Sequence, residues 1–234
     1  MTTIVTAKPT SKRISKVVRL NFLNPWPYFM TPWIIIGILM AATYVLGVTG
    51  LAGLSADGEI FFRPAYFLIV YLFVIANQTL YHQFPLALSY GITRKDFYRG
   101  TVVSALITSL VFAVGAMLIA LIMGDVAIDE PAALSHQGLL LLWAFLSIQL
   151  LGITLTSLYL RWRAVGVGSF FIALAAFLSA LPFIAGVWDA WDRIMRFFFA
   201  AEQLAIGWAI ATAFTTALAL AGYWLIRRAA PNQK

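Results

Sequence analysis

Few residues of this chain belong to the types that carry out catalysis. It has two histidines, His82 and His136, and no cysteine, and it contains neither an H-E-x-x-H motif nor a G-x-x-x-x-G-K-[ST] loop. The second motif would be needed to hold ATP phosphates by that route. The membrane topology that the charges indicate places the two histidines on opposite sides, so they cannot share a metal ion. We therefore expect no catalytic residue, no metal site and no cofactor in this chain.

A first polar group interrupts a long apolar run and consists of Asn77, Gln78, Tyr81 and His82. Ionisable groups at depth in a membrane often contact a substrate or an ion. Polar side chains in spans also join helices to one another by hydrogen bonds. Both interpretations stay open, and the residues alone favour interhelical hydrogen bonding over a pathway role.

A second polar group is the stretch LSYGITRKDFYRGT, which has three basic residues, one acid and three aromatics between apolar runs. Thr93 and Asp96 have the spacing of a capping box, in which each side chain satisfies a backbone donor at a helix start. Residues 94–98 are therefore expected to form a short helix, with Gly91 before it and Gly100 after it. The stretch could be a topological anchor or a docking element for another protein, and physical reasoning alone does not separate the two.

The elements that must position these residues are membrane spans. The chain has 234 residues, of which 62% are hydrophobic and 11% charged, whereas soluble domains are about half apolar and about a quarter charged. A bilayer crossing needs about 20 apolar residues, and six stretches qualify. The predicted fold is an all-α polytopic membrane protein with spans at about 33–54, 65–88, 101–124, 138–160, 164–187 and 204–226.

The basic residues indicate the orientation of these spans. With the N-terminus inside, thirteen of the sixteen lie in cytoplasmic segments, and only Arg63, Arg193 and Arg196 lie outside. The positive-inside rule then predicts a cytoplasmic N-terminus over 1–30, a membrane domain over 31–228 and a cytoplasmic tail over 229–234. The pI near 9.9 follows mostly from this topology, so we expect no nucleic-acid partner.

The N-terminal segment predicts a basic amphipathic helix. Lys12, Lys16 and Arg19 fall on one helical face opposite apolar residues, and Pro25 and Pro27 would end the helix. Such a helix can lie in the membrane interface. A purely topogenic anchor is the simpler interpretation of these residues.

The stretch QFPLALSYGITRKDFYRGT resembles the loop between spans two and three in permease subunits of type-2 ATP-binding-cassette exporters, above all small actinobacterial ones. The opening NPWPYFMTPWIIIG and the six-span plan are similar too. The resemblance implies that this loop forms a coupling helix seated in a cleft of a separate ATPase subunit. It also implies short re-entrant helices within 188–203. By position, the implied contact residues are Gly91, Thr93, Arg94, Lys95, Asp96, Phe97 and Tyr98.

The expectation is therefore a non-enzymatic permease subunit in a bacterial cytoplasmic membrane, surrounded by lipid. Two copies, or one copy and a paralogue, would form a pathway for a lipid, a peptide or a hydrophobic drug-like molecule. Two separate ATPase subunits would hold ATP and magnesium. The alternative is a self-standing membrane protein, such as a channel, an immunity protein or a secondary carrier.

Overall fold

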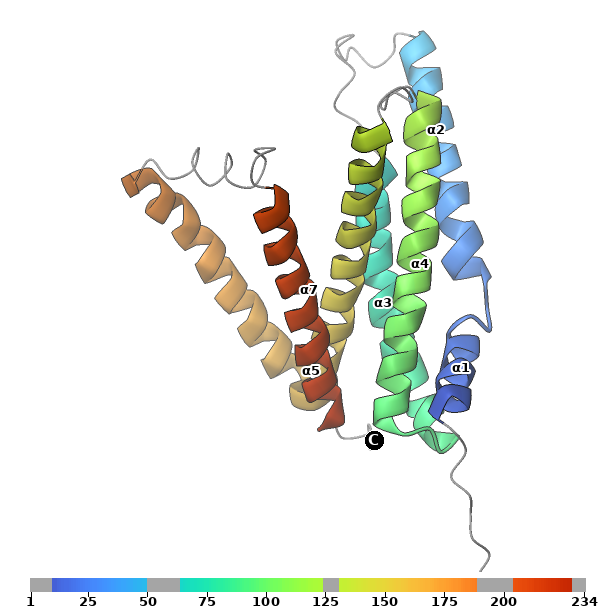
Figure 1. Ribbon diagram of the computed structural model, residues 1–234, viewed down its shortest axis with the longest axis vertical. Coiled ribbons are helices and arrows are strands. Elements are labelled where there is room, and N and C mark those ends of the chain that lie inside the picture. Colours follow the sequence, from blue (N-terminus) through green and yellow to red (C-terminus); the bar gives the residue numbers. More distant parts are fainter. Residues whose placement is uncertain (1–9, 50–63, 124–130, 189–203, 229–234) are drawn as a thin grey trace, which may run out of the picture. The chain divides into compact units, whose positions relative to one another are not determined.

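A computed structural model describes residues 10–49, 64–123, 131–188 and 204–228 of the chain (Figure 1). Every regular element in these ranges is a helix. The elements are α1 (Thr10–Asn21), η1 (Trp26–Met30, a π-helical turn), α2 (Thr31–Thr49), α3 (Pro64–Ser89), α4 (Arg94–Met123), α5 (Pro131–Trp188) and α7 (Leu204–Arg227). The all-helical prediction is therefore confirmed for the described part. The predicted re-entrant helices in 188–203 and the tail 229–234 lie outside it.

Four helices of the described part are long and apolar enough to cross a membrane, namely α3, α4, α5 and α7. A fifth candidate forms if α1 and the segment Trp26–Ala42 count as one bent span. The bounds of two of them follow the predicted apolar runs closely: α3 covers 64–89 where 65–88 was expected, and α7 covers 204–227 where 204–226 was expected. α4 begins at residue 94 and α5 at residue 131, each seven residues before the predicted run.

α5 has 58 residues and would be about 87 Å long if straight, nearly three times the thickness of a bilayer core. It is not straight, because Arg163 has φ 56° and ψ −146°, which no helix interior accommodates. This residue separates two arms that correspond to the apolar runs predicted at 138–160 and 164–187 (Figure 1).

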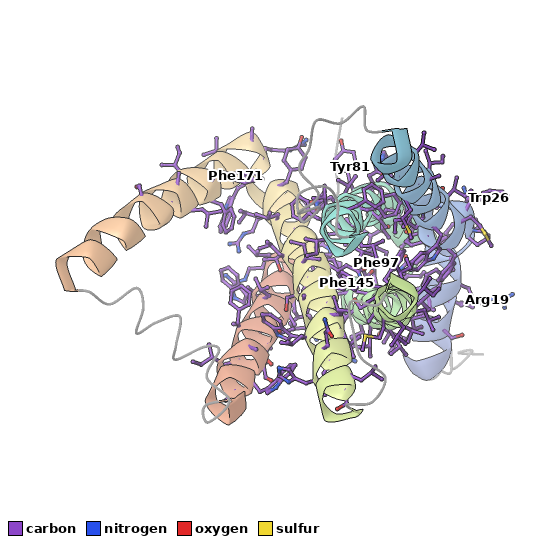
Figure 2. All side chains as sticks on the ribbon, turned by 90° about the horizontal axis from the view of Figure 1, so that it is seen from above. Arg19, Trp26, Tyr81, Phe97, Phe145 and Phe171 are labelled. Atoms are coloured by element: carbon purple, nitrogen blue, oxygen red, sulfur yellow. The ribbon has the colours of Figure 1, made fainter. Side chains whose placement is uncertain are left out.

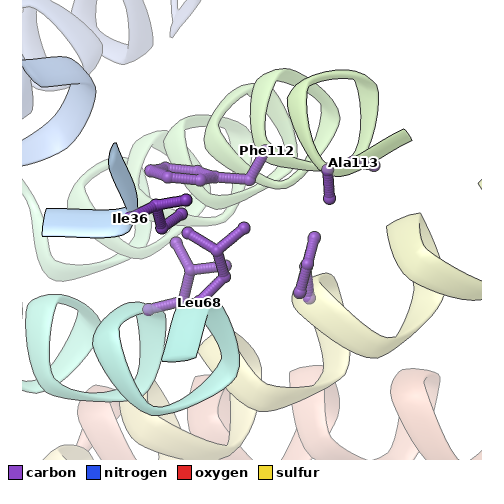
Figure 3. Close-up of a cluster of buried hydrophobic side chains, with 7 residues drawn as sticks. Ile36, Leu68, Phe112 and Ala113 are labelled. Carbon is purple, nitrogen blue, oxygen red and sulfur yellow. The ribbon is translucent and has the colours of Figure 1, made fainter. Parts of the chain in front are cut away.

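The chain divides into two compact units, Met1–Gly152 and Ile153–Lys234. The core of the first unit is a cluster of apolar side chains from four helices (Figure 3). Its buried members are Ile36, Leu68, Leu72, Phe112, Ala113, Ala116 and Phe145. In lipid, this close packing takes over the role that hydrophobic burial has in water.

Next to this core, α2 approaches α4 closely. The indole of Trp33 stacks on Phe112 with ring centroids 5.3 Å apart. A Cβ placed at Gly115 would lie 2.1 Å from the same indole, so only glycine leaves room for the ring. In the second unit, the Thr154 hydroxyl of α5 donates to the Leu218 carbonyl of α7 at 3.0 Å.

The N-terminal region contains the predicted amphipathic helix, α1, with Lys16 and Arg19 exposed and Val17 buried. α1 ends at Asn21, before Pro25, and lies at 70° to the helical segment that starts at Trp26. Such a bend suits an interfacial helix in front of a span, although its place at a membrane surface stays a prediction. Hydrogen bonds between Tyr28 and Thr79, and from the Tyr71 hydroxyl to the Pro27 carbonyl, attach this bend to α3.

Candidate functional site

The stretch with the capping box forms a tight, well-bonded turn between α3 and α4. The Ile92 amide donates to the Ala87 carbonyl at 3.1 Å, and the Gly91 amide donates to the Leu88 carbonyl at 3.0 Å. This pair of bonds is the Schellman motif that closes a helix C-terminus. It requires a left-handed residue at position 91, and Gly91 has φ 71°. The predicted boundary at Gly91 is therefore confirmed, with a specific geometric reason.

One half of the predicted capping box at Thr93 is present, whereas the Asp96 carboxylate pairs with Arg13 instead of forming the other half. The Thr93 hydroxyl accepts a bond from the Asp96 amide at 3.2 Å, and its carbonyl accepts one from the Phe97 amide at 2.9 Å. The separate short helix, however, is wrong. Residues 94–98 are the first turn of α4, which continues without a break to Met123. Gly100 lies inside this helix, because a single glycine weakens a helix without ending it.

The seven predicted contact residues differ in burial. Gly91, Thr93 and Lys95 are exposed, and the neighbouring Tyr90 is 70% exposed. Arg94 is half-buried. The other three, Asp96, Phe97 and Tyr98, are buried within this chain.

Phe97 has no accessible surface and lies 5.5 Å from the ring of Phe84 on α3, between the helices (Figure 2). Its side chain therefore holds α4 against α3 and is not available to a second protein. We call the exposed set, Tyr90, Gly91, Thr93 and Lys95, the α3–α4 tip.

α1 supports the start of α4 at three successive levels. Arg13 forms an ion pair with Asp96, with Nη1 and Oδ2 3.7 Å apart. One turn further on, Val17 packs on Gly100, where a Cβ would lie 2.5 Å from the Val17 Cβ.

At the third level, Asn21 Nδ2 donates to the Ser104 hydroxyl at 2.9 Å. From each of these three contacts to the next, the residue number rises by four in both α1 and α4, so the two helices pack side by side in parallel. We call this row of three contacts the α1–α4 seam. The sequence interpretation missed this α1–α4 seam. The available signal was the row of small residues at Gly100, Ser104 and Thr108, whose spacing lets helices approach closely.

A buried polar network continues from this seam towards α5. Gln149 donates through Nε2 to the Ser109 hydroxyl at 2.7 Å and to the Ala105 carbonyl at 3.2 Å. Its Oε1 accepts from the Thr108 hydroxyl at 3.1 Å. The amide group is thus satisfied at both ends, which is what a buried polar side chain needs. The network joins α4 to α5, and nothing in the sequence spacing had pointed to Gln149.

The electrostatics of the tip are dominated by cations. Asp96 is the one acidic residue of the part that the structure describes, and it is buried against Arg13. Lys16, Lys95 and Arg99 are exposed. A carboxylate at the first turn of α4 also has a favourable interaction with the helix dipole. The surface presented by the start of α4 is therefore basic, and it suits an acidic or polar partner surface.

The four polar residues of α3 lie in two environments. Asn77 donates to the Phe73 carbonyl at 2.7 Å and packs against Gly152 of α5, where a Cβ would lie 3.1 Å from its Nδ2. Gln78, Tyr81 and His82 are exposed. The rings of Tyr81 and His82 meet edge to face, 5.2 Å apart. Asn77 thus lies where α3 packs on α5, with the hydrogen bond described above made within α3, and the pathway and interhelical interpretations of the four residues both stay predictions.

Within the described ranges, no group of three or more histidine, aspartate or glutamate side chains could hold a metal ion. Comparisons with known proteins gave no match to a family model, to a curated protein or to a solved structure. The α3–α4 tip with its α1–α4 seam is therefore the candidate site on physical grounds alone.

Proposed function

We propose that this chain is the permease subunit of an ATP-binding-cassette exporter and that the α3–α4 tip is where a separate ATPase subunit docks. In this proposal both termini are cytoplasmic, and two permease chains form the pathway. Each chain crosses the membrane six times, through α2, α3, α4, the two arms of α5, and α7. The break at Arg163 supports this count, since it divides one helix that is too long for a bilayer into two that suit it.

The observation that carries the proposal is an exposed tip on a rigid frame. The turn is closed by the Schellman bonds and the Thr93 cap, so its backbone has little freedom. The tip leads directly into α4, a helix of 30 residues and about 45 Å. If an ATPase pushed on the α3–α4 tip, α4 would therefore move as a rigid body.

The α1–α4 seam supports the same function. A push on the tip without the seam could bend the first turns of α4 away from the bundle. The ion pair at Asp96, the contact at Gly100 and the bond at Ser104 hold those turns against α1. A simple topological anchor has no need of such a frame, because positive charge alone is sufficient for anchoring.

Affinity purification of the tagged chain from its native membranes in mild detergent tests the proposal. We expect a protein with an ATP-phosphate-binding loop to co-purify, and ATP hydrolysis to be present in the complex. The double variant Tyr90→Ala, Lys95→Glu should lose this partner while remaining folded, since both side chains are exposed. Gln137→Glu, an exposed position at the start of α5, is the matched control.

Retention of the ATPase by the double variant would show that the tip is not the docking surface. Purification of the folded wild-type chain without any nucleotide-binding partner would favour the self-standing membrane protein instead.

A further inference from the structure

The break in α5 brings arginine and tryptophan side chains together at one end of the second unit. The guanidinium carbon of Arg161 lies 4.3 Å from the ring centroid of Trp162 and 4.5 Å from that of Trp224 on α7. The guanidinium carbon of Arg228 lies 4.8 Å from the Trp224 ring. Trp224 thus contacts two cations, Arg161 of α5 and Arg228 directly after α7. We call these four residues the Arg161 cluster.

No carboxylate from the described residues of the second unit balances the charge of the Arg161 cluster. The described part of the second unit, residues 153–188 and 204–228, contains no aspartate or glutamate. Arg161 Nη1 is buried and has no hydrogen-bond acceptor. A buried donor without an acceptor is costly, and a charged one more so. The indole faces balance part of the charge, but a ring face does not take the place of an oxygen acceptor in the guanidinium plane.

The backbone of the break is also unusual. Arg163 has positive φ, which is rare for a residue with a side chain and clusters at functional or tightly constrained sites. A glycine would relieve the conformation at that position. Instead, the chain has an exposed arginine at this position.

The Arg161 cluster lies at the ends of two apolar helices. The first arm of α5 reaches Arg161 after an uncharged run from Pro131, and α7 reaches Arg227 after an uncharged run from Leu204. Arginine and tryptophan at such ends lie at the level of the lipid headgroups. The anions available at that level are phosphates, and the planar fork of a guanidinium matches their oxygens.

We propose that the Arg161 cluster binds the phosphate of an anionic phospholipid headgroup. Arg161 provides the planar fork, held between two indoles, and Arg228 provides a second charge. Trp162 and Trp224 are each 46% exposed, and in this proposal their indoles move aside to admit a phosphate oxygen to Nη1. The proposal does not depend on the chain being a permease, because it uses only the second unit and the ends of its apolar helices.

Native mass spectrometry of the detergent-purified full chain, titrated with phosphatidylglycerol and separately with phosphatidylcholine, tests this site. We expect phosphatidylglycerol to bind more tightly. Arg161→Gln should weaken that binding by about tenfold, as expected for the loss of a charge-assisted hydrogen bond. Arg228→Gln changes an exposed side chain, so it should fold normally, and it should weaken binding several-fold. The control Arg99→Gln removes the same charge from an exposed site and should keep the affinity within about threefold.

Inorganic phosphate in the same titration, followed by thermal unfolding, separates a lipid from a free ion. Stabilisation by phosphatidylglycerol but not by millimolar phosphate supports a headgroup site, whereas equal stabilisation by both assigns the site to free phosphate and overturns the lipid proposal. If Arg228→Gln and Arg99→Gln lose the same amount of phosphatidylglycerol affinity, the binding is a general attraction between charges, and the proposal of a specific site is wrong. Equal binding of the two lipids by the wild-type chain would contradict the proposal as well.

Discussion

The contact between Val17 and Gly100 can be tested by adding a single methyl group. In Gly100→Ala, the new Cβ would lie 2.5 Å from the Val17 Cβ, 2.6 Å from its Cγ1 and 3.3 Å from the Ile14 carbonyl oxygen. These atoms belong to the backbone of α1 or lie next to it, so no flexible side-chain end can move aside. α1 itself must shift away from α4.

The magnitude follows from two opposing terms. Overpacking a well-packed contact costs about 1–3 kcal/mol. Replacing glycine by alanine inside a helix contributes about 1 kcal/mol in the other direction. Gly138→Ala in α5 isolates the second term, because no atom lies within 4 Å of the new methyl group. Gly100→Ala should therefore be about 1–3 kcal/mol less stable than Gly138→Ala, which is about 2–12 °C in Tm for a chain of this size.

The assay combines thermal unfolding in detergent with limited trypsin digestion. α1 contains four trypsin sites, Lys12, Arg13, Lys16 and Arg19. A shifted α1 should be cut faster in Gly100→Ala than in Gly138→Ala. If the two variants unfold at the same temperature and α1 is cut at the same rate, the α1–α4 seam does not have the close packing described above.

Three further predictions concern other parts of the chain. Gln149→Leu should lower the free energy of unfolding by about 1–3 kcal/mol, because the buried partners of Gln149 lose their hydrogen bonds. Gln137→Leu, at an exposed position, is the control, and equal stability of the two variants would show that the polar network does not stabilise the fold. Asp96→Asn should cost no more than about 1 kcal/mol, since Arg13 is partly exposed, and the loss should shrink at high salt; a loss unaffected by salt would mean that the ion pair is not its cause. An impermeant thiol reagent on intact cells should label Ala190→Cys and spare Lys8→Cys in this cysteine-free chain; labelling at position 8 would reverse the topology.

Much of the helical framework could be predicted from the sequence because each apolar run is bounded by charge, glycine or proline. The bounds of α3 and α7 agree with prediction to within one residue at each end. The cap at Thr93 and the turn at Gly91 could be predicted because both depend on bonds between near neighbours in the chain.

The errors arise where distant segments meet. The sequence predicts a helix end at Gly100, but the role of this glycine is to admit Val17, and that contact spans 83 residues of sequence. The resemblance implies a docking role for Phe97, whereas its partner is Phe84 within the same chain. An aromatic residue in a charged stretch has the same local sequence in either case. Only the position of α3 and α1 decides which side of α4 is covered.

The Arg161 cluster could not be predicted either, for the same reason: its residues come from segments that are distant in the sequence. The sequence assigns Arg161 and Arg163 to a topological role, which positive charge at the end of a span fully explains. That Trp224 of α7 lies against Arg161 is a consequence of helix packing, and no spacing within either segment encodes it.

The central claim is that the α3–α4 tip contacts an ATPase, and site-directed cross-linking tests it most directly. Because the chain has no cysteine, Thr93→Cys places one thiol on the exposed tip, and Gln137→Cys places one at the exposed start of α5 as a control. A thiol-reactive cross-linker applied to native membranes should join position 93, but not position 137, to a protein with an ATP-phosphate-binding loop. Intact Thr93→Cys chain that yields no such adduct, or equal adducts from both positions, would contradict the account.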